Sequence, residues 1–181
     1  MNSIYKSLLR PFLFNLDAEH AHNCASRILS LTEHSNLSRR LIQFVSSTDS
    51  PKLNLFGLTF QNQIGLAAGM DKNAQFPQTY SSLGFGHVEI GTVTPKPQSG
   101  NQKPRLFRYP SYNAIVNRMG FNNDGVEKIV KRIENFYPKG KRTSPLGINI
   151  GKGKNTPIEN ALEDYIFCLN KSFNQADYIT I

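Results

Sequence analysis

The sequence has few cysteines and no long apolar segment. Its two cysteines, Cys24 and Cys168, lie far apart in the chain and lack the CxxC spacing or nearby histidine partners that zinc and redox sites require. No apolar run approaches the roughly 20 residues needed to span a bilayer. Near the start, Arg10, Pro11 and Asn15 interrupt any signal-peptide core. We therefore expect reduced thiols, no metal site, and neither export nor a membrane-spanning helix.

Several motifs of common enzyme classes are also missing. The sequence contains no GxGxxG after a predicted strand, no GxxxxGK[ST], no HExxH and no GxSxG. Their absence argues against the usual nucleotide-binding sites, zinc proteases and serine hydrolases. Three of the four histidines fall in the N-terminal 34 residues and His87 opens a predicted strand, so none is well placed as a catalytic base.

The composition is that of a globular protein with a strongly basic region. A chain of 181 residues with 39% hydrophobic residues suits one ordinary domain with a small appendage. The net charge is +8, and residues 96–154 hold thirteen lysines and arginines. A solvated face, a site for small anions, or a surface for nucleic acid or acidic lipid would each explain this cluster. The cations are scattered without an aromatic stacking platform, which argues against nucleic acid as a partner.

Residues 1–50 are predicted to form a small helical module. Apolar residues recur at helical spacing in three segments, and Asp17 is placed to cap the second helix. The polar, proline-bearing residues 46–53 are typical of a linker. We therefore expect a helical module over 1–50 and a second domain over 51–181.

Short strands and helices alternate after the linker. A hairpin turning at Gly57 is expected first. The expected buried strands cover 64–69, 87–93, 145–151 and 176–181, and the expected helices cover 122–137 and 156–174. Thr156 and Glu159 have the spacing of a capping box for the last helix. Apolar strands that alternate with helices indicate an α/β fold with a parallel sheet or barrel.

In a parallel α/β protein the loops at the carboxyl ends of the strands carry the active site. Residues 67–73, AAGMDKN, have little side-chain bulk, which would let a flat ligand approach the backbone, and Lys72 adds a positive charge. Close helix–strand packing and a surface lysine are the plainer explanations. Thr92, at the end of the next strand, could bind a ligand or merely satisfy a turn.

Asparagines are concentrated in two further places. Residues 117–125, NRMGFNNDG, carry amides that could bind the alternating donors and acceptors of a pyrimidine or isoalloxazine ring. The plainer explanation is that Asn122 or Asn123 caps the following helix. Asn149 falls within a predicted buried strand, where leaving its amide unpaired would cost about 1–3 kcal/mol. A ligand partner for Asn149 is therefore plausible.

Taken in order, four long segments resemble the class 2, quinone-dependent dihydroorotate dehydrogenase family. They are GLTFQNQIGLAAGMDKN, LGFGHVEIGTVTPKPQSGNQKPRLFR, NRMGFNNDGV and GINIGKGKNTPIE, and RPFLFNLDAEHAH near the start extends the likeness over nearly the whole chain. The resemblance implies a TIM (β/α)8 barrel, of which the first half is present, preceded by the helical module. That module would shape a quinone tunnel and rest, as a peripheral element, on the cytoplasmic side of the cell membrane.

The resemblance also implies FMN as cofactor and dihydroorotate or orotate as ligand. The residues implied to contact FMN are Ala68, Gly69, Met70, Asp71, Lys72, Thr92 and Asn149. Those implied to bind the substrate are Lys72, Asn117, Arg118, Met119, Gly120 and Phe121. The reaction would oxidise dihydroorotate to orotate with a quinone as acceptor, in de novo pyrimidine (UMP) biosynthesis.

In this family a serine base takes a proton from C5 of dihydroorotate while hydride passes from C6 to flavin N5, and quinone then reoxidises the flavin. That serine lies in an NxSSPNT segment, which would follow Ile181. We therefore expect no catalytic residue in this chain, and expect the 181-residue polypeptide alone to fold poorly and be inactive.

Two alternatives remain open beside this expectation. The chain could be a truncated, inactive fragment of the same enzyme. It could also belong to another FMN-dependent barrel oxidoreductase, such as a class 1 dihydroorotate dehydrogenase with a cysteine base, although residues 1–50 argue against that class.

Overall fold

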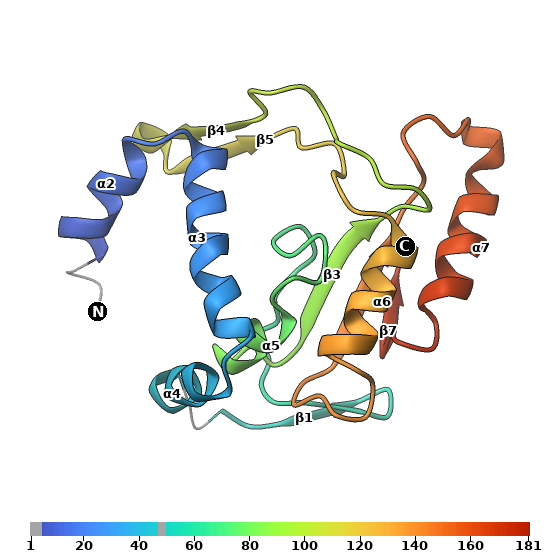
Figure 1. Ribbon diagram of the computed structural model, residues 1–181, viewed down its shortest axis with the longest axis horizontal. Coiled ribbons are helices and arrows are strands. Elements are labelled where there is room, and N and C mark those ends of the chain that lie inside the picture. The colour runs from blue at the N-terminus through green and yellow to red at the C-terminus, as the bar shows by residue number, and fades with distance from the viewer. Residues whose placement is uncertain (1–4, 47–49) are drawn as a thin grey trace.

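A computed structural model describes residues 5–46 and 50–181. The first four residues of the predicted helical module and residues 47–49 of the predicted linker lie outside the described residues. Figure 1 shows the N-terminal helices to one side and a parallel sheet with its covering helices to the other.

The N-terminal part is helical, as predicted. It consists of a π-helical turn η1 (Tyr5–Leu9), α2 (Arg10–Phe14), α3 (Ala18–Glu33) and α4 (Asn36–Ser46). The predicted cap is confirmed, because the Asp17 carboxylate accepts hydrogen bonds of 3.0 Å from the backbone N–H groups of Glu19 and His20. These bonds satisfy donors that the first turn of a helix otherwise leaves unpaired.

The predicted hairpin is also confirmed. Strands β1 (Leu53–Leu55) and β2 (Leu58–Phe60) pair antiparallel. Phe56 and Gly57 form the turn with φ angles of 55° and 74°. Positive φ at both central residues matches the right-handed twist of the two strands.

A parallel sheet organises the rest of the structure. Within the described residues it contains β3 (Val88–Val93), β6 (Leu146–Ile150) and β7 (Tyr178–Thr180), in that spatial order. Helix α6 (Val126–Phe136) leads from β3 toward β6, and α7 (Ala161–Ser172) leads from β6 to β7. The fold is therefore α/β, as the alternation of strands and helices predicted.

The core lies between the sheet and its helices. Ile90 of β3, Ile148 of β6 and Ile129 of α6 are fully buried there. Alternation along the strands directs polar residues to the opposite face. On that face the Glu89 carboxylate accepts hydrogen bonds from the Tyr178 hydroxyl at 3.2 Å and the Thr180 hydroxyl at 3.1 Å.

The strand predicted over 64–69 is wrong. The pairing there is a single parallel bridge, in which Leu66 donates to the carbonyl of His87 at 3.0 Å and accepts from the N–H of Glu89 at 2.8 Å. The chain then leaves the ladder because Gly69 takes a φ of 108°, a conformation open mainly to glycine.

The capping box predicted for the last helix is wrong as well. The 3-10 turn η3 (Ile158–Asn160) precedes α7, and no side-chain cap forms at either start. Thr156 lies in an earlier turn, where its N–H donates to the carbonyl of Gly153 at 3.2 Å. The carboxylate of Asp164 holds that turn by accepting from the N–H of Gly153 at 2.7 Å.

Two elements were not anticipated from the sequence. One is the short helix α5 (Pro77–Ser82). The other is the antiparallel hairpin of β4 (Leu106–Tyr109) and β5 (Ala114–Asn117), which are joined by the 3-10 turn η2 (Pro110–Tyr112).

A buried carboxylate joins the N-terminal helices to the α/β part. Glu33, at the end of α3, is only 3% exposed. Its oxygens accept from the N–H and the hydroxyl of Thr79, both at 2.8 Å, and from the N–H of Gln78 at 3.2 Å. Burial raises the pKa of Glu33 above its ordinary value, although the donors from Thr79 oppose the shift. Glu33 thus supplies acceptors for the first turn of α5.

Replacing Glu33 by alanine is expected to lower the free energy of unfolding by about 1–3 kcal/mol, because the N–H groups at the start of α5 lose their acceptor. Since the folded-state pKa is raised, the stabilisation by Glu33 is fully present below the ordinary value of 4.5 and declines as pH rises through the folded value. The loss should therefore be larger in acid than at neutral pH.

Urea denaturation of the purified protein at several pH values measures this difference. Glu163→Ala, at an exposed position of α7, is the matched control and should be nearly neutral. Equal stabilities for Glu33→Ala and the wild type would contradict the assignment.

Candidate functional site

A cavity of about 550 Å³ lies at the carboxyl ends of the parallel strands. Its walls come from the ends of β3 and β6, from the loops that follow β3, β5 and β6, from α7, and from the residue that follows β7. The lining residues are Thr92, Gln98, Asn101, Gly120, Phe121, Asn149, Ile150, Gly151, Lys152, Lys154, Tyr165 and Ile181. The cavity occupies the edge where parallel α/β proteins bind ligands.

Two predicted cofactor residues meet at this edge. The Thr92 hydroxyl at the end of β3 donates a hydrogen bond to the side-chain oxygen of Asn149 on β6. Both residues are half-buried. The close approach needs a glycine before Thr92, since a Cβ at Gly91 would collide with the backbone carbonyl of Asn149. The Asn149 side-chain NH2 has no hydrogen-bond partner among the described residues and is available to a ligand.

The predicted substrate segment, residues 117–121, reaches the cavity only at its end. Gly120 and Phe121 line the cavity, with φ angles of 75° and 52°. Asn117, the last residue of β5, and Arg118 are exposed, and Met119 is half-buried. The structure therefore brings Gly120 and Phe121 to the same place as Thr92 and Asn149, but not Asn117 and Arg118.

The loop of residues 67–73 is tied to β3 next to the cavity. Ala68 and Gly69 are half-buried, and Met70 is 43% exposed. The N–H of Gly69 donates to the carbonyl of Gly91 at 2.9 Å, and the N–H of Gly91 donates to the carbonyl of Asp71 at 3.2 Å. These bonds place the loop alongside the strand that carries Thr92.

The side chain of Asp71 organises its own loop. It is 2% exposed, and its two oxygens accept from the N–H groups of Gln75 and Phe76, both at 2.8 Å. Burial raises the pKa of Asp71, while these backbone donors oppose the shift. The carboxylate is thus occupied within the protein, which leaves the backbone of Asp71 for any contact with a cofactor.

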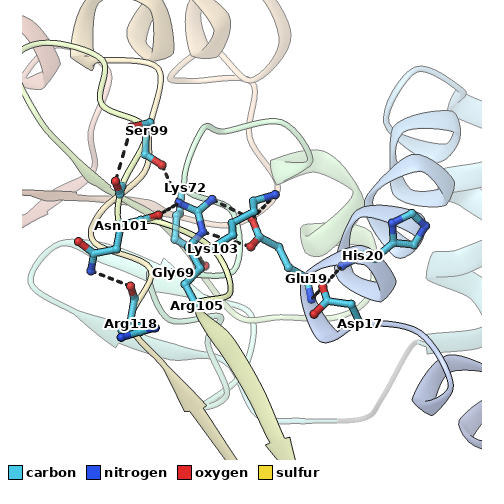
Figure 2. Close-up of polar contacts among 11 residues, drawn as sticks. Asp17, Glu19, His20, Gly69, Lys72, Ser99, Asn101, Lys103, Arg105 and Arg118 are labelled. Carbon is cyan, nitrogen blue, oxygen red and sulfur yellow. Dashed lines mark hydrogen bonds and ion pairs between the residues drawn. The ribbon is translucent and has the colours of Figure 1, made fainter.

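Lys72 lies in a positively charged environment. Figure 2 shows it beside Arg105, with its ammonium donating to the carbonyl of Gly69. Burial lowers the pKa of Lys72, the positive charge of Arg105 lowers it further, and the charges of Asp71 and Glu19 oppose the shift. An anionic ligand group beside Lys72 would relieve the repulsion between the two cations.

The cap predicted from Asn122 or Asn123 is wrong. Helix α6 follows Gly125 without a side-chain cap. The amide of Asn123 instead joins two loops: its oxygen accepts from the N–H groups of Gly125 at 2.9 Å and Thr94 at 3.3 Å. Its NH2 donates to the Thr94 hydroxyl at 2.9 Å and to the carbonyl of Phe121 at 2.7 Å. Asn123 therefore fixes Phe121 relative to the end of β3.

Sequence reasoning missed residues of the cavity that lie farther from the strand ends. The side-chain oxygen of Gln98 accepts from the N–H of Lys154 at 3.0 Å, and its NH2 donates to the carbonyl of Gly120 at 3.1 Å. Gln98 thus links the loops that follow β3, β5 and β6. The available signal was the polar stretch PKPQSGN directly after β3, which the prediction for Thr92 did not use.

The family model described as dihydroorotate dehydrogenase matches residues 50–181. Two relatives named dihydroorotate dehydrogenase (quinone) are from Psychrobacter sp. (strain PRwf-1), at 50% identity, and Stenotrophomonas maltophilia (strain K279a), at 51%. Each alignment runs over 175 residues, which are 97% of this chain and 48% of the relative. The chain thus spans about half the length of the curated relatives it matches.

A solved crystal structure also aligns with most of this chain and with less than half of its own length. The crystal structure of dihydroorotate dehydrogenase from Eimeria tenella in complex with ferulenol aligns with a TM-score of 0.67 and 38% identity. The alignment covers 80% of this chain and 42% of that protein. The family model covers well over half of the chain, and the quinone-dependent relatives match almost all of it, so the chain belongs to the dihydroorotate dehydrogenase family.

Proposed function

We propose that this chain forms part of a class 2 enzyme that oxidises dihydroorotate to orotate through FMN, with a quinone as electron acceptor, in de novo pyrimidine (UMP) biosynthesis. One observation carries the proposal. The Thr92–Asn149 pair and the Gly120–Phe121 turn line one cavity at the carboxyl ends of the strands. The chain that forms this cavity is 50% and 51% identical in sequence to two quinone-dependent relatives.

We infer further that the parallel strands belong to a TIM (β/α)8 barrel. This inference is supported by the order β3-β6-β7 of the parallel strands, in which α7 connects β6 to β7, and the β4–β5 hairpin and α6 lie between β3 and β6. The bridge of Leu66 to Val88 adds the preceding segment on the other side of β3. In this proposal residues 1–50 are the helical module and residues 51–181 belong to the barrel.

The cavity edge fits a flavin. The cavity volume lies within the usual range of about 300–1,000 Å³ for ligand sites, and Asn149, whose NH2 has no partner among the described residues, lines the cavity. Gly69 has open space where a Cβ would stand. FMN would be held by Ala68, Gly69, Met70, Asp71, Lys72, Thr92 and Asn149. When bound, FMN supplies hydride transfer and one-electron steps toward a quinone.

The residues of this chain would bind and orient dihydroorotate. Lys72 offers a cation for its carboxylate, and the segment Asn117–Phe121 offers amide and backbone groups for its ring. The general base is expected in the part of the relatives that this chain does not match, since the chain covers 48% of their length.

The N-terminal helices expose apolar side chains that could contact a membrane and a quinone dissolved in it. Apolar side chains stand exposed on η1, α2 and α4, with Leu8 69%, Phe12 66% and Phe44 82% exposed. Within residues 5–46 and 50–181, no helix has the length and apolar character needed to cross a bilayer. We therefore propose that these helices lie against the cytoplasmic side of the cell membrane.

The function is tested on the protein purified at the length of its curated relatives. It is expected to show flavin absorbance and to reduce a quinone when dihydroorotate is added, with little activity toward fumarate or NAD. A protein that used fumarate or NAD in preference to quinone would belong to another functional class. Absence of both flavin and dihydroorotate oxidation would refute the proposed function.

The charge of Lys72 is expected to matter for substrate affinity. Lys72→Met should raise the dissociation constant of orotate roughly 10- to 100-fold, because a hydrogen bond to a charged group contributes about 1.5–3 kcal/mol. Isothermal titration with orotate measures the effect. Lys131→Met, at an exposed position of α6, is the control and should bind as the wild type does. Unchanged binding by Lys72→Met would rule out the proposed contact.

Membrane attachment is expected to depend on the apolar side chains of the N-terminal helices. Leu41 and Phe44 of α4 are 60% and 82% exposed, and replacing both by serine should reduce co-sedimentation with phospholipid vesicles. Ile158→Ser, at a 78% exposed position far from these helices in sequence, serves as control and should leave it unchanged. Equal sedimentation of both variants would show that α4 is not the attachment surface.

A further inference from the structure

A buried ion pair connects helix α3 to a segment next to the cavity. Arg105 donates from Nε to one oxygen of Glu19 at 3.1 Å and from Nη2 to the other at 2.8 Å. Arg105 is 7% exposed and Glu19 9%. Hydrogen bonding to Arg105 lowers the pKa of Glu19, which favours the ionised carboxylate. Lys103 also approaches Glu19, at 3.2 Å, but its side chain is 64% exposed.

The same guanidinium holds the backbone of residues 98–105, a segment that we call the strap. Nη1 of Arg105 donates to the carbonyls of Ser99 at 2.6 Å and Asn101 at 3.0 Å. Figure 2 shows Arg105 between these carbonyls and Glu19. The planar fork of an arginine permits these contacts together, whereas a lysine offers a single point charge.

The strap in turn holds the proposed substrate segment. Asn101 donates from its N–H to the carbonyl of Met119 at 2.9 Å and from its side-chain NH2 to that of Arg118 at 2.8 Å. Gln98 donates to the carbonyl of Gly120 at 3.1 Å. The N–H of Arg118 donates to the carbonyl of Arg105 itself at 2.9 Å. Consecutive carbonyls of the segment are therefore bonded to the strap.

We propose that Glu19 and Arg105 are positioning residues: their ion pair fixes the strap, and through it the segment Asn117–Phe121 that forms the dihydroorotate site. This inference rests on the proposed function of that segment. The N-terminal helical region thus has a second task besides contact with quinone or membrane, because Glu19 on α3 orders the site of the other substrate.

The effects of Arg105 and Glu19 on the pKa of Lys72 are consistent with this positioning role. Arg105 lies close enough to Lys72 to lower the pKa of the lysine, and Glu19 opposes that effect. Glu19 therefore compensates a cation that would otherwise stand unpaired beside the lysine proposed to bind the substrate carboxylate. Loss of Glu19 would release the strap and leave Arg105 buried without its counterion.

The test uses the flavin-containing protein at the length of its relatives, with Glu19→Gln as the main variant. The dissociation constant of orotate, from isothermal titration, is expected to rise about tenfold, since small displacements of a binding group have large effects. Anaerobic reduction of the flavin by dihydroorotate should need correspondingly more substrate. Flavin content and the rate of reoxidation by a soluble quinone should remain close to the wild-type values.

Two control variants separate positioning from general loss of stability. Glu33→Ala removes the other buried carboxylate of α3, which contacts α5 and not the strap; it should lower the midpoint of thermal unfolding without weakening orotate binding. Lys103→Gln removes the exposed partner of Glu19 and should change orotate binding less than twofold. Arg105→Lys should weaken binding as Glu19→Gln does.

The orotate-binding results separate the positioning role of Glu19 and Arg105 from the proposed function. If the wild type binds orotate and Glu19→Gln binds it equally well, the positioning role is refuted while the proposed function stands. The role is also refuted if Glu33→Ala weakens binding as much as Glu19→Gln does. If the wild type neither binds orotate nor oxidises dihydroorotate, the proposed function fails and the inference fails with it. Should Glu19→Gln not fold, Glu19→Asp replaces it, with an intermediate loss expected.

Discussion

The parallel pairing of β3 with β6 is the contact on which the site depends. Ile90 lies opposite Ile148 in this register, and both are buried against the helices. Because side chains alternate along a strand, burying these isoleucines directs Glu89 and Asn149 to the other face. Because the strands are parallel, their following loops meet at one edge. A ladder of apolar residues thus determines where the polar groups of the cavity come together.

Two carboxylates of α3 then connect the N-terminal helices to this framework. Glu33 provides acceptors at the start of α5, and Glu19 binds Arg105 of the strap. A carboxylate removed from water is costly unless donors replace its hydration. Each of the two carboxylates accepts from several donors, so the two contacts together constrain how α3 is placed on the α/β part. The helices and the α/β part therefore have a defined relation, although they differ in composition.

Local sequence patterns predicted the main elements but not the contacts between distant segments. Short, mostly apolar runs ending in or near glycine indicated β3 and β6, helical spacing indicated α6, and Gly57 marked the hairpin. The expected capping box failed because a turn at Gly153 competes for Thr156, and Asp164 stabilises that turn from eleven residues away. Glu19 and Arg105 are 86 residues apart, and no periodicity or motif relates them. The sequence was enough to identify the loops after the strands as a candidate site. It was not enough to identify the residues, such as Glu19 and Arg105, that hold those loops in place.

The bonds that hold Met119, Gly120 and Phe121 all end on main-chain carbonyls. The location of this turn is consequently independent of the side chains that it displays. Exchanges at Phe121, which lines the cavity, would therefore change the surface of the cavity while these backbone contacts remain. The contacts that place the turn are thus separate from the side chains that the turn presents. A side chain at this position can therefore be changed, in evolution or by protein engineering, without rebuilding the surrounding structure.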